Sequence, residues 1–84
     1  MSGKHRRTWE AVFAEPVRSH IPWRDIEAML KAVGAKITEG HGSRVRIALN
    51  GVRAVFHRPH PQKEADRGAV RSMPRFLTEA GVTP

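Results

Sequence analysis

An Asn-Gly pair in the middle of the chain is the feature that most restricts the fold. Asn50-Gly51 separates two segments, 43–49 and 52–57, in which apolar and polar residues alternate. Asn-Gly favours the two-residue turn that joins antiparallel strands, and alternation is typical of strands with one buried face. The segment 35–39 alternates in the same way ahead of the loop 40–42. The sequence therefore predicts a three-stranded antiparallel meander.

A two-residue turn also determines which side chains share a face of this sheet. Pairing outward from the turn predicts one apolar face, whose cross-strand pairs are Leu49 with Val52, Ile47 with Ala54, and Val45 with Phe56. A tight 40–42 loop adds Ile37 to that face. The opposite face then collects basic side chains and no acidic residue from the strands: Lys36, Arg44, Arg46 and Arg53. Like charges this close repel one another, so we expect an anionic ligand, against the alternative of a merely solvated face.

Three stretches with apolar residues at helical spacing predict helices over 8–15, 22–33 and 67–80. Thr8 is the expected N-cap of the first, Pro22 suits the first turn of the second, and Asp66 is the expected N-cap of the third. Pro74 falls inside the last helix, so that helix either kinks or splits there. The predicted order is α-α-β-β-β-α, an α+β fold with the helices on one face of the sheet.

The length, charge and cysteine content of the chain restrict the classes of function that it can have. The chain has 84 residues, so we expect residues 8–84 to form a single domain after a flexible basic arm at 1–7. Fifteen Lys and Arg against eight Asp and Glu give a net charge of +7, which favours an anionic partner. Cysteine is absent, which excludes disulfides and thiol catalysis. No apolar run is long enough for a signal peptide or a membrane span, so we expect a cytoplasmic, nucleic-acid-binding protein.

Several short motifs, in their order and spacing, resemble the HicA toxin family over about residues 8–82. They are DIEAML at 25–30, Gly34-Ala35, Gly42-Ser43, GAVRS at 68–72 and AGV at 80–82. The resemblance implies a fold like the double-stranded-RNA-binding domain. It also implies an mRNA interferase of a type II toxin-antitoxin pair, which cleaves RNA without a metal or other cofactor and is inhibited by a HicB-like antitoxin.

The resemblance also directs attention to the catalytic group. In the family, the strand after the Gly-Ser pair opens with a catalytic histidine, and here Arg44 stands at that position. Arginine cannot accept a proton at neutral pH, whereas an imidazole can. The catalytic candidates are therefore His57, which the predicted register places opposite Arg44, then His60, and last His41. Pro59-His60 matches the family's proline-and-histidine segment loosely, without the usual intervening residue.

The proposed RNA contacts are the basic residues of the strands and of the loop that follows: Lys36, Arg44, Arg46, Arg53 and Arg58. His57 and His60 could also bind a metal, but no third ligand stands at a characteristic spacing, so we expect no metal site. The alternative function is a HicA-like module that has lost catalysis and only binds RNA or a protein partner.

Overall fold

The structure is a computed structural model that describes residues 1–60 and 62–83. Its elements follow the predicted order: α1 (Gly3–Phe13), α2 (Trp23–Ala32), β1 (Lys36–Glu39), β2 (Arg44–Leu49), β3 (Val52–His57) and α3 (Arg67–Glu79). The three strands form one antiparallel sheet in the order β1-β2-β3. The predicted α+β fold is confirmed.

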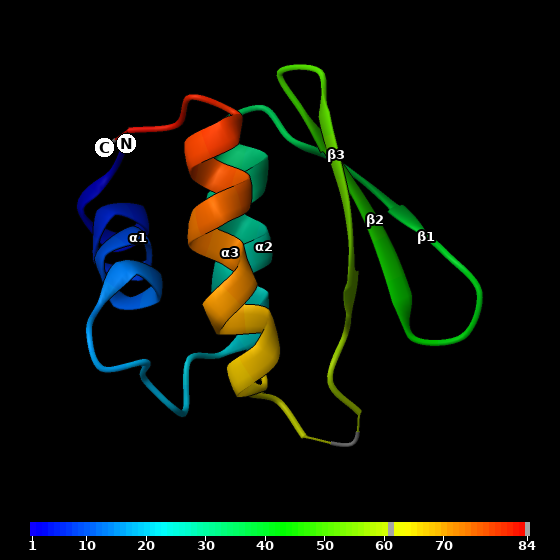
Figure 1. Cartoon of the computed structure of the whole chain (residues 1–84), viewed down its shortest axis with the longest axis horizontal. Helices are drawn as coiled ribbons and strands as arrows, with labels where there is room; N and C mark the ends of the chain where they lie inside the picture. The colour runs from blue at the N-terminus through cyan, green and yellow to red at the C-terminus, as the bar shows by residue number, and fades with distance from the viewer. Residues whose placement is uncertain (61, 84) are drawn as a thin grey trace.

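The helices lie on one side of the sheet and leave its other face open (Figure 1). α2 packs against β1 and α3 against β3, whereas α1 contacts α2 and α3 but not the sheet. An aromatic group joins the two inner layers, with the ring of Phe56 at 6.2 Å from that of Trp23 and 5.9 Å from that of Phe76. The core therefore lies between the sheet and these two helices.

The strand register agrees with the prediction. Leu49 pairs with Val52 across the turn, and the pairs Ile47 with Ala54 and Val45 with Phe56 follow. Asn50 and Gly51 have φ angles of 50° and 81°, as a type I′ turn requires. The Asn50 side-chain amide also donates to the carbonyl of Ala80 at 2.8 Å, which ties the turn to the end of α3.

The predicted start of the first helix is wrong, and of the two alternatives at Pro74 the split does not occur. α1 begins at Gly3, because Ser2 is its N-cap and accepts from the amide of His5 at 3.3 Å. Thr8, the expected N-cap, is a buried residue inside that helix, so residues 3–7 belong to α1 instead of preceding it. α3 does not split at Pro74, since one helix continues through that residue to Glu79.

Candidate nucleic-acid interface

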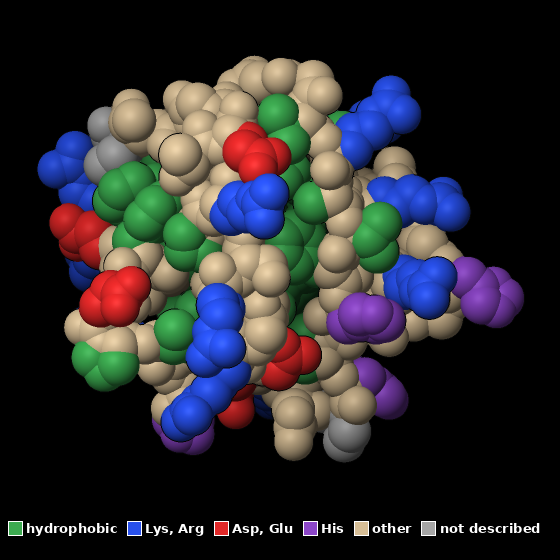
Figure 2. Space-filling view, viewed as in Figure 1, with side chains coloured by type: hydrophobic (Ala, Val, Ile, Leu, Met, Phe, Trp, Pro, Cys, Tyr) green, Lys and Arg blue, Asp and Glu red, His purple; other side chains and the backbone are tan. Residues whose placement is uncertain are grey.

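The face of the sheet turned away from the helices carries the predicted cations. We call it the basic face and define it by the outward residues of the three strands: Lys36, Thr38, Arg44, Arg46, Ala48, Arg53, Val55 and His57. Its four cations are exposed, and in residues 1–60 and 62–83 none of them forms a salt bridge. Figure 2 shows Lys, Arg and His side chains gathered on the sheet side of the molecule. This face therefore offers unneutralised positive charge to solvent.

The cations of the basic face are staggered across the strands. Arg46 lies between Thr38 and Val55, and Ala48 separates Lys36 from Arg53. No cation is thus directly opposite another, which limits the repulsion between neighbouring strands. A shallow hollow runs over the same residues, lined by Lys36, Thr38, Arg46, Ala48, Arg53 and Val55. The arrangement spaces positive charge along a surface instead of concentrating it at one point.

Three of the five histidines lie at one end of the sheet. Arg44 pairs with His57, as the predicted register requires, and both side chains are exposed. The Nδ1 atom of His57 lies 3.5 Å from the hydroxyl oxygen of Ser43. His60 lines a small hollow with Ser43, and His41 is exposed in the loop before Ser43. We call these residues, His41, Ser43, Arg44, His57 and His60, the histidine end of the sheet.

A glycine contact sets the position of Arg44. The amide of Gly40 donates to the carbonyl of Arg44 at 2.8 Å. A Cβ atom at position 40 would lie 3.0 Å from that carbonyl oxygen and 3.1 Å from the Arg44 Cβ, closer than side-chain carbons ordinarily come. A side chain at residue 40 would therefore push β2 away where the histidine end begins.

Arg58 points away from the basic face. Its Nε and Nη2 atoms lie 3.0 and 2.9 Å from Glu27 Oε2, and its Nη1 lies 2.9 Å from Glu39 Oε1. These hydrogen bonds, to Glu27 first and to Glu39 second, raise the pKa of Arg58 above its ordinary value. Its backbone amide donates to the carbonyl of Ser43 at 2.8 Å. Two carboxylates already occupy this guanidinium, so it anchors the chain between His57 and His60.

Sequence reasoning gave no role to Glu27 or Glu39. Glu27 accepts from Arg58 and also from the indole Nε1 of Trp23, and its side chain is only 15% exposed. Arg58 stands 31 residues from Glu27 and 19 from Glu39 along the chain. The only local signal was the i, i+4 spacing of Trp23 and Glu27 in the predicted second helix, which brings them to one side of it.

Among the residues that the structure describes, no group of three or more His, Asp or Glu side chains is placed to hold a metal ion. In that same part of the chain, no helix combines the length and the apolar character needed to cross a membrane.

Comparison with protein-family models identifies a family for this chain. Residues 23–82 match a family model described as the HicA toxin of bacterial toxin-antitoxin systems. The match begins at the first residue of α2 and runs past the end of α3, so it includes the whole sheet and leaves α1 outside. Searches among curated proteins and among solved structures gave no match. Since the family model covers well over half of the chain, the chain belongs to the HicA toxin family.

Proposed function

We propose that this protein is the toxin of a type II toxin-antitoxin pair and that it cleaves mRNA in the cytoplasm. Membership of the HicA toxin family supports the toxin part of the proposal. The observation that carries the rest is the pairing of Arg44 with an exposed histidine, His57, at one end of an unneutralised basic face. A cation and a proton-transfer group are thereby side by side where a phosphate would arrive.

In this proposal, the basic face binds the RNA backbone. Lys36, Arg46 and Arg53 contact phosphates along the strand, and Arg44 receives the phosphate that is to be cleaved. Val55, 58% exposed between Arg53 and His57 on β3, offers an apolar surface to a base. Arg58 is not needed for binding because Glu27 and Glu39 hold it.

The proposed chemistry uses the histidine end. One imidazole, that of His57, takes the proton of a ribose 2′-hydroxyl, and the 2′-oxygen then attacks the adjacent phosphorus. The bond from phosphorus to the 5′-oxygen breaks as His60 gives that oxygen a proton, so the products are a 2′,3′-cyclic phosphate and a 5′-hydroxyl. Arg44 stabilises the negative charge that develops on the phosphoryl oxygens. Ser43 restrains the His57 ring through its contact with Nδ1.

A HicB-like antitoxin completes the proposal. The chain carries a net charge of +7, and its four sheet cations are exposed and unpaired in the described residues. An acidic protein surface placed over the basic face would neutralise these cations and exclude RNA from Arg44. The antitoxin therefore competes with the substrate for one surface.

The decisive experiment measures cleavage of RNA by the purified chain, freed of any partner. We expect His57→Ala to lower the rate by about 10²- to 10⁴-fold, the usual contribution of general acid-base catalysis. The matched control is His20→Asn, because His20 is an exposed histidine in a different hollow, beside Lys4 and Arg7. Cleavage that survives both His57→Ala and His60→Ala would overturn the proposed mechanism.

The second candidate function is a binding module without cleavage. The occupation of the family's catalytic position by Arg44 favours it, since a guanidinium cannot exchange a proton at neutral pH. The substitution Arg44→His separates the two functions. Cleavage that appears only in this variant identifies a binding module, whereas an active wild type that gains nothing from the change shows that Arg44 has a catalytic role of its own.

A further inference from the structure

We propose that the outer edge of β3, with the groove beside it, binds an extended protein segment in which acidic residues alternate with small apolar ones. The segment would add to the sheet as a fourth strand next to β3. The site shares Arg53 and His57 with the basic face, but the outward backbone groups of β3 and the groove toward α3 have no part in the RNA cleavage proposed above. The proposal holds whether or not the chain cleaves RNA.

β3 has one free edge. The strand order β1-β2-β3 leaves this strand with a neighbour on one side. Because a two-residue turn makes Leu49 and Val52 a hydrogen-bonded pair, the backbone groups of Val52 and every second residue after it point to β2. Those of Arg53, Val55 and His57 therefore point outward. None of these three residues has a backbone hydrogen bond to another segment within residues 1–60 and 62–83.

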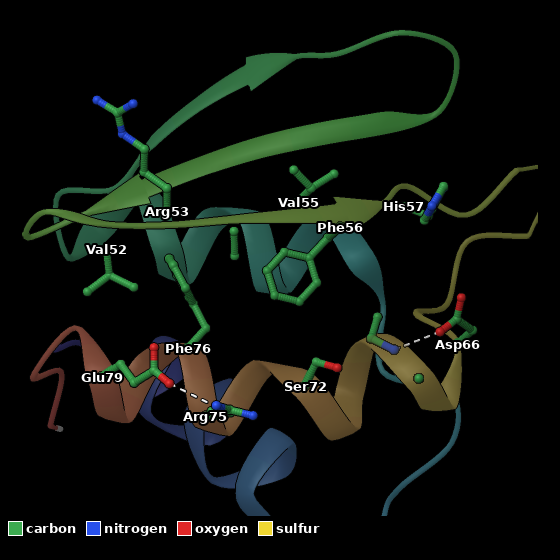
Figure 3. A pocket seen from close by; sticks show the side chains of 13 residues that line it. Val52, Arg53, Val55, Phe56, His57, Asp66, Ser72, Arg75, Phe76 and Glu79 are labelled. Carbon is green, nitrogen blue, oxygen red and sulfur yellow. Dashed lines mark hydrogen bonds and ion pairs between the residues drawn. The ribbon is translucent and has the colours of Figure 1, made fainter.

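A groove lies between β3 and α3. Val52 and Phe56 point from β3 toward α3, while Arg53 and Val55 point to the other side of the strand (Figure 3). On the facing wall, the first half of α3 contributes small residues, Gly68, Ala69 and Ser72, and the second half contributes Arg75, Phe76 and Glu79. The hollow has a volume of about 520 Å³, within the range of ordinary ligand sites. There is room for the side chains of a strand beside β3.

Charged side chains surround the groove. Figure 2 shows a strip of hydrophobic surface between α3 and the sheet, with basic and acidic side chains beside it. The two acidic residues that line the groove already have partners, because Asp66 accepts from the amide of Ala69 and Glu79 pairs with Arg75. Arg53 is the lining arginine that forms no salt bridge among the described residues. A strand paired with β3 turns alternate side chains to the basic face, next to Arg53 and His57, and the others into the groove, next to Phe56. Acidic side chains suit the first environment, and small apolar ones suit the second.

The same charges argue against a second copy of this chain as the occupant. Two β3 edges paired antiparallel about Val55 would bring Arg53 of one copy beside His57 of the other. That pairing would extend a face that already holds Lys36, Arg44, Arg46 and Arg53 with no acidic residue among its members. Like charges in neighbouring strands are unfavourable, so a partner of opposite charge fits better.

The experiment uses a blocked heptapeptide in which Glu alternates with Val or Ala, added to the ¹⁵N-labelled full chain. Amide hydrogen exchange is expected to slow at least tenfold at Arg53, Val55 and His57. The amides of Val52, Ala54 and Phe56 already bond to β2 and serve as the internal reference. A heptapeptide with Lys in place of Glu is expected to give no protection.

Two substitutions and one modified probe complete the test. Val55→Pro removes an outward amide without touching the bonds to β2, and it is expected to weaken peptide binding at least tenfold, while Val55→Thr keeps the amide and retains binding. Should the proline variant fail to fold, a peptide N-methylated at its pairing positions tests the same bonds on the unchanged protein, and it is expected not to bind.

Four results would overturn the proposal. They are an absence of protection at the three outward amides, equal binding of the Lys peptide, protection of the same amides by self-association without peptide, and perturbation of Ser72 and Phe76 by an oligouridylate instead of the peptide. Because every readout is exchange or binding, a failure of RNA cleavage does not affect the result.

Discussion

The two faces of the sheet share the same strands but obey different constraints. On the inner face, Val45 and Ile47 are completely buried and Leu49 and Phe56 nearly so. On the basic face, Arg44, Arg46 and Arg53 are exposed. The inner face stabilises the fold by removing apolar surface from water, so its positions require apolar residues. The basic face buries little, so its composition is free to serve a ligand, and a change there should affect binding more than stability.

The largest expected effect comes from the inner face. Ile47→Ala should lower the free energy of unfolding by about 2–5 kcal/mol, because it removes buried methyl groups and leaves a cavity. Its neighbour Arg46 points to solvent, and Arg46→Ala should change the same quantity by less than about 0.5 kcal/mol. Urea denaturation of the two variants measures both values. A loss of similar size in Arg46→Ala would show that the basic face is structural and would remove the distinction between the faces.

An intermediate effect is expected on the inner side of the sheet, at the carboxylates around Arg58. The side chain of Glu27 is 15% exposed and that of Glu39 is 67% exposed. Glu27→Gln should therefore cost about 1.5–3 kcal/mol of unfolding free energy, the range for hydrogen bonds to charged groups. Glu39→Gln is the control and should cost less than about 1 kcal/mol, as exposed ion pairs do. Thermal or urea unfolding tests this order, and a larger loss in Glu39→Gln would contradict it.

The smallest effect on the fold, and a specific one on binding, is expected from Arg53→Gln. This change should leave stability nearly unaltered and should reduce the slope of log affinity against log salt by about 0.7 for single-stranded RNA, as expected for one lost phosphate contact. Arg24→Gln on α2 is the matched control, because Arg24 is exposed but lies outside the basic face. Binding assays over a series of salt concentrations measure the slope. Equal slopes in both variants would show that the face does not hold RNA.

The sheet could be predicted from the sequence because its signals are local. Alternation and the Asn50-Gly51 turn were enough to give the pairing of Arg44 with His57, which the structure confirms. The start of α1 was missed because the basic residues at 4–7 show no apolar periodicity, although they form the first turns of the helix that Ser2 caps. Local patterns thus predicted the strands better than the ends of the helices.

The histidine end could be predicted only in part. The role of Arg58 was missed because its partners come from α2 and β1, and no sequence pattern reports contacts over such separations. His60 and Ser43 line one hollow because of how the chain continues after β3. Apolar periodicity predicts strands and helices but not the path of such a loop. The catalytic roles of His57 and His60 stay predictions until cleavage is measured.

The contact between Gly40 and Arg44 has a consequence for how this site can vary. It involves the carbonyl and Cβ of residue 44, which every amino acid except glycine supplies in the same place. The contact therefore does not depend on the rest of the side chain at residue 44, and we expect Arg44→His to leave the surrounding strands unchanged. An imidazole and a guanidinium can thus be compared at residue 44 on one backbone.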